Sequence, residues 1–370
     1  MERTEPYWKV SPDEVRSEAN VAASVDSTAQ GFVLLKNERK TLPFTASKSV
    51  AVIGPHAGSR QGLLGNYIGQ ICPGLDSKGA EGFGCVQSIT EAVCNATAKG
   101  GKACTTSPGA PSVGEQTPDT GMIASAVKVA SEADQIVLVL GIGSSIEAES
   151  KDRKNTSLPG AQIALWKAIA AEANKTSAEL VVVLINGGVL DIEEMVAEDA
   201  IGSIVEAWYP GFFGAGALAS TVFGEENRFG KLPVTIYDKG FDMDVLDFCM
   251  SCGLGRTYKY YQGTPVFPMG FGLSCEWLFG VRSVVSIEWP LAASLVASLP
   301  RSFSLFPSLS LSLPPSLLPS FPPSLPLSHL LSFPPCSPHS STPPAYQTPR
   351  SPSRPMQSNL PPQTPASRSP

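Results

Sequence analysis

Four ionisable side chains lie close together in the middle of the chain, at Glu147, Glu149, Asp152 and Arg153. They follow an unbroken apolar run at 136–140 and a short turn rich in glycine and serine. Neighbouring carboxyl groups can divide acid and base work between them, because one can hold a proton while the other is ionised. The spacing therefore predicts a carboxylate site for proton transfer, and the competing interpretation is a solvated charged loop.

Alternating apolar runs and helix-like stretches predict the elements that position this cluster. The runs at 50–53, 136–140, 180–185 and 204–207 are short and apolar, as expected for strands that are covered on both faces. Helices are expected at about 11–30, 88–98, 121–133, 158–173 and 215–223, with a Gly-, Cys- and Pro-rich loop between the second and the third. This alternation predicts an α/β fold, a three-layer αβα sandwich with a mainly parallel sheet.

The carboxyl ends of parallel strands meet at one edge of a sheet, which is where open α/β sheets bind ligands. That edge would gather the charged cluster, the NGG turn at 186–188 and Trp208 in the WYPG turn. Glycines, an aromatic residue and carboxylates at one edge predict a small-molecule cleft. A dinucleotide site is not favoured because GIGSSI lacks the third glycine of the fingerprint, and a serine-hydrolase site is not favoured because G-x-S-x-G is absent.

The composition divides the chain of 370 residues unevenly. Residues 290–370 contain no Asp, Glu or Lys and hold 21 of the 34 prolines, which interrupt the chain too often for a regular core or a membrane helix. We therefore expect an N-terminal helix and linker at 1–45, a sandwich domain at 46–277 and a disordered Pro/Ser/Leu-rich tail at 278–370, which is also the pattern of a gene-prediction artefact. The net charge of −6 and the lack of a basic face argue against a nucleic-acid partner.

The cysteines indicate whether the protein contains disulfides or a metal site, and the amino terminus indicates whether it begins with a signal peptide. Cys72, Cys85, Cys94 and Cys104 fall in one loop-rich region, where disulfides formed in an oxidising compartment are the favoured interpretation. A zinc site is not expected, because His56 is the only histidine outside the tail, and no other metal or cofactor is predicted. The first ten residues, MERTEPYWKV, have no apolar segment of the signal-peptide type.

Several short motifs occur in the order that is found in one known family. They are QGFVLLKNE, VAVIGPHA, GNYIG, IEAESKDR, INGG, WYPG and GKLPVTIY, followed by GRTYKYY and FGLS. From about residue 22 to residue 274 the chain resembles glycoside hydrolase family 3. The IEAE-x-x-D-R form is similar to that of the plant and fungal β-xylosidase/α-L-arabinofuranosidase branch.

The resemblance implies a division of work between two domains. In this family a barrel domain carries the aspartate nucleophile, and the following α/β sandwich supplies the acid/base glutamate from a loop after a strand. The match to E-x-x-D-R implies that Glu149 is the acid/base, with Glu147 as its rival. Asp152 and Arg153 are expected to pair as support for the loop, with sugar contact as the alternative. Trp208 is a candidate for substrate binding.

By the same resemblance the chain is expected to be a fragment of a retaining exo-glycosidase that releases xylose or arabinose from xylan or arabinoxylan, outside the cell or in its wall. Its partners would be an oligosaccharide substrate and the missing barrel domain, but neither nucleic acid nor a membrane. The face that packs on the barrel is expected to expose Trp208, Phe212 and Phe213.

Departures from the family pattern leave two alternatives open. The nucleophile motif, the Lys-His sugar-binding motif and the trailing fibronectin-like domain have no counterpart in this sequence, so the isolated chain is not expected to hydrolyse glycosides. A non-catalytic carbohydrate-binding sandwich domain is the first alternative. A Pro-rich scaffold with an inert head is the second.

Overall fold

The computed structural model describes residues 10–69, 71–72, 80–241 and 248–273. The tail predicted at 278–370 lies outside these residues, as do the first nine residues of the predicted N-terminal linker. The predicted sandwich domain is described up to residue 273.

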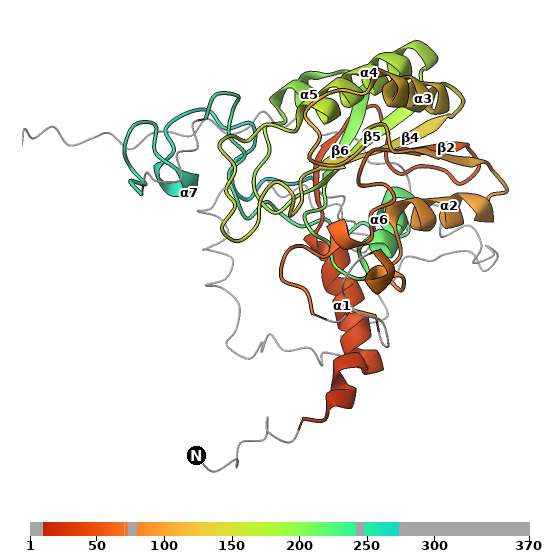
Figure 1. Ribbon diagram of the computed structural model, residues 1–370, viewed down its shortest axis with the longest axis horizontal. Helices are drawn as coiled ribbons and strands as arrows, with labels where there is room; N and C mark the ends of the chain where they lie inside the picture. The colour runs from red at the N-terminus through yellow and green to blue at the C-terminus, as the bar shows by residue number, and fades with distance from the viewer. Residues whose placement is uncertain (1–9, 70, 73–79, 242–247, 274–370) are drawn as a thin grey trace, which may run out of the picture. The chain divides into compact units, whose positions relative to one another are not determined.

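Six strands form one mixed sheet in the order β1-β6-β5-β4-β2-β3 (Figure 1). The strands are β1 (Val33–Asn37), β2 (Val50–Ile53), β3 (Cys104–Ser107), β4 (Gln135–Gly141), β5 (Glu179–Ile185) and β6 (Ile201–Glu206). Neighbouring strands run parallel, except that β1 pairs antiparallel with β6. The predicted mainly parallel sheet is therefore confirmed, and the carboxyl ends of β2, β4, β5 and β6 share one edge.

Helices cover both faces of this sheet and complete the three predicted layers (Figure 1). The α-helices are α1 (Glu18–Gly31), α2 (Ile89–Lys99), α3 (Thr120–Ser131), α4 (Gly160–Thr176), α5 (Glu193–Ala197), α6 (Gly214–Val222) and α7 (Thr257–Tyr260). Helices α3, α4 and α5 pack on one face, while α2, α6 and the last turns of α1 pack on the other. Short 3-10 helices occur at Pro12–Arg16, Gln61–Leu63 and Ala80–Phe83.

Strand β4 explains why both faces are covered. All seven of its residues are buried, and successive side chains enter opposite layers. Ile136 and Leu138 belong to the core beneath α3 and α4, whereas Val137 and Val139 belong to the core beneath α2 and α6. Full burial of such a side chain contributes about 1.5–3 kcal/mol, so the centre of the sheet holds the end of β4 firmly in place.

Two local predictions were wrong. Strand β3 lies where a loop was expected, because its polar CTTS sequence forms a half-exposed edge strand that pairs with β2 and is joined to α2 by the Cys94–Cys104 disulfide. The helix expected at 11–30 is divided into the 3-10 turn at Pro12–Arg16 and α1. Extended Ser17 separates the two and caps α1 with its own side chain.

Disulfides and a bridge from the last described segment to β1 add further links within the domain. The described cysteines form three disulfides, Cys72–Cys85, Cys94–Cys104 and Cys249–Cys252. The segment after α6 returns to the sheet, where Leu273 forms a bridge with Leu34 of β1. No helix in the described part of the chain has the length and apolar character needed to cross a bilayer.

Candidate active site

The backbone is held tightly where β4 ends. Gly141 has a φ of +143°, and a Cβ atom there would lie 1.8 Å from the Ile185 carbonyl oxygen of β5, so only glycine fits. The Gln162 side chain of α4 accepts a hydrogen bond from the Gly141 N–H at 2.9 Å and donates one to the Gly141 carbonyl at 2.7 Å. The turn that follows β4 therefore starts from a fixed position.

Glu149 occupies the tip of a tight hairpin beyond this turn. The hairpin is closed by two backbone hydrogen bonds between Ala148 and Lys151, of 3.0 and 2.9 Å. Glu149 and Ser150 form its two-residue turn, and Ser150 takes the left-handed conformation with φ +63°. The Glu149 side chain is exposed, and its carboxylate is hydrogen-bonded to the hydroxyl of exposed Tyr67, whose pKa this bond raises.

Glu147 lies at the base of the hairpin, and both of its carboxylate oxygens are bound. Oε2 accepts a hydrogen bond of 2.8 Å from Nε of Arg153, and Oε1 accepts one of 2.8 Å from the Gly188 N–H. Arg153 is only 6% exposed, and its Nη1 also donates to the Val189 carbonyl at 3.0 Å. This salt bridge joins the turn after β4 to the turn after β5.

The WYPG turn after β6 forms the adjacent wall. Trp208 is half-buried and has a left-handed backbone, with φ +57°. The Tyr209 ring packs against Gly187, where a Cβ atom would lie 2.7 Å from the Tyr209 Cε2 atom. Burial and, second, the negative charge of Glu147 raise the pKa of Tyr209 to about 12, so its hydroxyl stays protonated at neutral pH. The Gly211 N–H donates to the Leu63 carbonyl, which brings the 61–69 loop beside this turn.

The structure brings most of the predicted site residues to the expected edge. Arg153, however, pairs with Glu147 and not with Asp152 as expected, because the guanidinium reaches back across the hairpin. Asp152 is exposed and forms no hydrogen bond or ion pair with the described residues. Phe212 and Phe213 are half-buried, as is Trp208, so the exposed aromatic side chain at this edge is Tyr67.

Three buried polar residues at this edge were given no role of their own from the sequence, although Asn186 belongs to the NGG turn that was expected here. Glu206 ends β6, Asn186 follows β5, and His56 follows β2, and each is at most 1% exposed. The Nε2 atom of His56 lies 3.1 Å from the Ile142 carbonyl, and burial lowers the pKa of its ring to about 4. The only sequence signal for Glu206 is that an acidic residue interrupts an apolar run.

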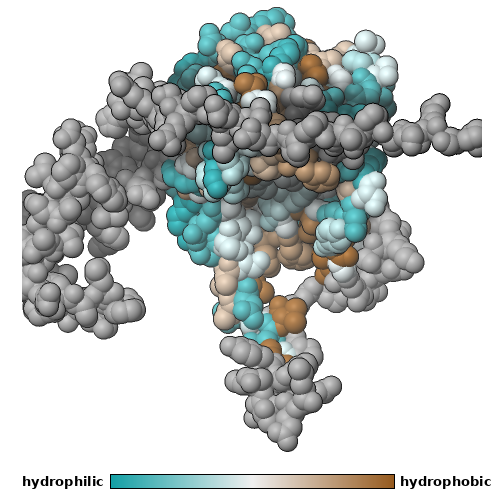
Figure 2. Space-filling model, turned by 90° about the vertical axis from the view of Figure 1, so that its left-hand side faces the viewer, coloured by the Kyte–Doolittle hydropathy of each residue, from teal (hydrophilic) through white to brown (hydrophobic). Residues whose placement is uncertain are grey.

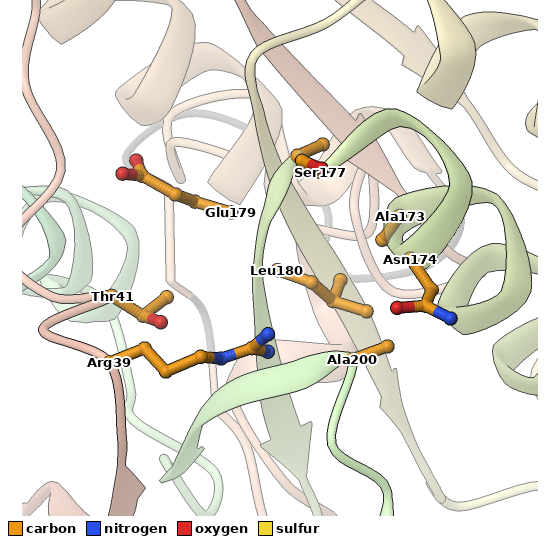
Figure 3. A pocket seen from close by; sticks show the side chains of 9 residues that line it. Arg39, Thr41, Ala173, Asn174, Ser177, Glu179, Leu180 and Ala200 are labelled. Carbon is orange, nitrogen blue, oxygen red and sulfur yellow. The ribbon is translucent and has the colours of Figure 1, made fainter.

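The pocket in Figure 3 is partly open to solvent and lies away from this site. It has a volume of about 210 Å³ and is lined by residues that precede β5 and β6 or follow β1, among them Arg39, Glu179 and Ala200. Parallel strands begin at that end, so the cavity and the carboxylates are at opposite edges of the sheet. Glu149 lies on the exposed surface of the opposite edge.

Comparison with known proteins finds matches over most of the described domain. The family model for the glycosyl hydrolase family 3 C-terminal domain matches residues 32–275. Probable β-D-xylosidase 7 of Arabidopsis thaliana is 37% identical over 275 residues, which cover 73% of this chain and 33% of that protein. β-Xylosidase/α-L-arabinofuranosidase 1 of Medicago sativa subsp. varia is 34% identical over 279 residues, which again cover 73% and 33%.

Solved structures give the same picture. A family 3 exo-β-xylosidase in complex with a xylobiose aziridine probe superposes with a TM-score of 0.59 at 30% identity, over 73% of this chain and 33% of that one. A family 3 β-glucosidase of Bifidobacterium adolescentis superposes with a TM-score of 0.55 at 27% identity, over 72% and 38%. The chain thus spans about one third of the length of these curated relatives.

Proposed function

Because the chain belongs to glycosyl hydrolase family 3, through the C-terminal domain of that family, we propose that it is the sandwich part of a retaining exo-glycosidase. Its reaction is hydrolysis of O-glycosyl bonds of the β-D-xylosidase/α-L-arabinofuranosidase type, in the breakdown of xylan or arabinoxylan. Glu149 supplies the acid/base carboxyl group, and the nucleophile comes from a barrel domain outside the span of this chain.

The difference between the two glutamates carries this proposal. A catalytic acid must release its proton to the leaving oxygen and take one back from water, so its carboxyl group must be free to reach the substrate. Both oxygens of Glu147 are bound, one by the Arg153 guanidinium and one by the Gly188 N–H. Glu149 is exposed at the tip of a rigid two-residue turn, with the Tyr67 hydroxyl as its partner.

The two half-reactions follow from this arrangement. The Glu149 carboxyl protonates the glycosidic oxygen while the aspartate of the barrel attacks the anomeric carbon, which breaks the glycosidic bond and forms a glycosyl ester. Glu149, now a carboxylate, takes a proton from water as that water attacks the same carbon and releases the aspartate. The Glu147–Arg153 pair supports the hairpin through both steps.

Surface features fit a domain that is part of a longer secreted protein. Of the residues in α1, only Ala29 is buried, while Val21 and Val25 are 36% and 42% exposed. Figure 2 shows this helix standing away from the rest of the domain, with apolar surface in the hollow beside it. The three disulfides fit an oxidising compartment, so we propose an extracellular or cell-wall location.

The test transplants residues 32–275 in place of the matching segment of Probable β-D-xylosidase 7. We expect the hybrid to hydrolyse aryl xylosides. Glu149→Gln should slow the hydrolysis of xylosides with poor leaving groups by about 10²–10⁴-fold, which is the usual contribution of general acid catalysis. It should slow the hydrolysis of xylosides with activated leaving groups far less.

Glu147→Gln is the matched control, because it changes the same chemical group two residues away. It should slow all leaving groups by one common factor, because it disturbs the position of the hairpin and not proton transfer. If Glu147→Gln, and not Glu149→Gln, were slowed most for substrates with poor leaving groups, Glu147 would be the acid/base and Glu149 the support of the loop. A hybrid that binds xylose, seen as quenching of Trp208, without turning over any xyloside would favour the carbohydrate-binding alternative.

A further inference from the structure

Glu206 is a buried acid at the same edge of the sheet, and the reaction proposed above does not use it. It is the last residue of β6, is 1% exposed, and lies beside Leu184 of β5 and Val33 of β1. Among the described residues no lysine, arginine or histidine forms an ion pair with it. An uncompensated carboxyl group in a core is costly to keep, so its contacts require an explanation.

The Glu206 carboxyl group connects the two turns that border the site. Its Oε1 accepts a hydrogen bond of 3.3 Å from the Trp208 N–H, and the Asn186 side chain lies near enough to the group to lower its pKa. The Asn186 amide donates to the Gly188 carbonyl at 3.0 Å, and the Gly188 N–H donates to Glu147 at 2.8 Å. A series of polar contacts, three of them hydrogen bonds, therefore runs from Trp208 through Glu206, Asn186 and Gly188 to Glu147 at the base of the hairpin.

Both turns depend on these contacts. The left-handed backbone of Trp208 is unfavourable for a large side chain and must be held by its surroundings. Asn186 is fully buried, and its Oδ1 atom has no hydrogen-bond partner among the described residues. The hydrogen bond to Gly188 and the contact with Glu206 orient this amide, so loss of the Glu206 contact should weaken the support of both turns.

The surroundings of Glu206 favour the neutral acid. Burial raises its pKa to about 8, and the hydrogen bonds from Trp208 and Asn186 lower it only in part. The titratable groups on the elements around it are engaged elsewhere. Lys36 of β1 donates to the carbonyls of residues 196 and 198, Glu179 of β5 pairs with Lys48, Lys231 beside β1 donates to Gly272, and Tyr209 faces Glu147 and Arg153.

We propose that Glu206 is a positioning residue that, as a neutral carboxylic acid, ties the 186–188 turn to the 207–211 turn and so holds Glu147 and Trp208 in place. Loss of its proton puts an unpaired charge in the core. The N–H donors of Trp208 and Asn186 favour this charge, but burial outweighs them, so hydration of the carboxylate should open both turns. A loss of turnover at alkaline pH that does not involve Glu149 is a consequence that rests on the proposed function. The protonation of Glu206 and its effect on Trp208 can be tested whether or not the proposed function is correct.

The first measurement uses the full chain labelled with ¹³C-glutamate and follows the infrared band of protonated carboxyl groups from about pH 6 to about pH 9.5. The wild-type protein should show one buried protonated glutamate that ionises at about pH 8, and Glu206→Gln should lack it. Absence of this band from the wild-type protein would overturn the proposal, and this outcome does not require any variant to fold.

The second measurement follows Trp208 fluorescence over the same pH range, with Trp208→Phe used to identify its contribution. The His56 ring, with a pKa near 4, and the Tyr209 hydroxyl, with a pKa near 12, do not titrate in this window. The wild-type emission should shift to the red with a midpoint at about pH 8, and Glu206→Gln should keep the low-pH emission throughout.

Glu172→Gln is the matched control, because Glu172 is also buried but lies on α4 and pairs with Lys175. This variant should retain the transition in Trp208 emission. The same transition in Glu206→Gln would show that another group causes it and would overturn the proposal.

The third measurement compares turnover by the transplanted domain across the same pH range. The wild-type hybrid should lose activity above about pH 8, while Glu206→Gln should not. An identical alkaline fall in both hybrids overturns the positioning role. If neither hybrid turns over any xyloside, the proposed function fails, and the infrared and fluorescence results still decide the role of Glu206.

Discussion

The Glu147 carboxylate and the Arg153 guanidinium, six residues apart in the chain, form a salt bridge in which Oε2 and Nε are 2.8 Å apart. This pair closes the base of the hairpin that presents Glu149 at its tip. Ion pairs on the surface contribute little, but here the arginine is almost fully buried and bound on two sides. Within E-A-E-S-K-D-R, Glu147 therefore supports the loop, while Glu149 is exposed at its tip.

Replacing Arg153 with Met should destabilise the domain. The change leaves the Glu147 carboxylate, which is 23% exposed, with only the Gly188 N–H as a partner. We expect the free energy of unfolding in urea to fall by about 2–3 kcal/mol, somewhat below the cost of breaking a fully buried pair. Glu149→Gln should stay within about 0.5 kcal/mol of the wild type, because its side chain is exposed. Equal losses for both variants would contradict the different roles of the two glutamates.

Two tyrosines report separately on the two glutamates. The hydrogen bond to Glu149 raises the pKa of Tyr67, whereas burial and then the charge of Glu147 raise the pKa of Tyr209. Glu149→Gln should lower the pKa of Tyr67 and leave that of Tyr209 unchanged. Glu147→Gln should lower the pKa of Tyr209 and leave that of Tyr67 unchanged. An NMR titration of the tyrosine ring carbons measures both, and a shift of Tyr67 in the Glu147 variant would mean that the hairpin has changed its fold.

Gly188 cannot carry a side chain without displacing the salt bridge. A Cβ atom there would lie 2.4 Å from Nη2 of Arg153 and 2.8 Å from Oε2 of Glu147. Gly188→Ala should lower the free energy of unfolding by about 1–3 kcal/mol, the usual cost of overpacking. Gly58→Ala is the control, because a Cβ atom at Gly58 meets open space. Urea unfolding of the two variants checks the prediction, which fails if their stabilities are equal.

His56 should limit stability in acid. Its folded-state pKa of about 4 is below the ordinary 6.5, so the unfolded chain binds the proton first as the pH falls. This contribution to stability is complete above pH 6.5, and falling pH between these two values removes up to about 3 kcal/mol. In His56→Gln, whose amide can still donate to the Ile142 carbonyl, this pH dependence should disappear. Unfolding curves measured at several pH values test this prediction. If the free energy of unfolding of the variant changed with pH as steeply as that of the wild type, the prediction would be wrong.

Much of the fold was predictable because its strands are buried on both faces. The apolar runs of β2, β4 and β5 can be read without any tertiary information, and they predicted the parallel sheet and the edge at which the candidate residues lie. Strand β3 could not be predicted in this way, because its polar residues are stabilised by pairing with β2 and by the Cys94–Cys104 disulfide. The same limit applies to the break at Ser17, which depends on how the chain enters α1.

The sequence by itself determined the family, the order of the buried strands β2, β4, β5 and β6, and the pair of candidate glutamates, because these depend on local pattern and motif order. The motif match ranked Glu149 above Glu147, but only the tertiary structure showed that their surroundings differ. The decisive contact is the Gly188 N–H, which follows a strand 41 residues further along the chain and binds only one of the two carboxylates. The structure likewise drew attention to Glu206, because it is buried beside Asn186 and Trp208. The burial and the partners of a side chain depend on segments that come together only when the sheet has formed.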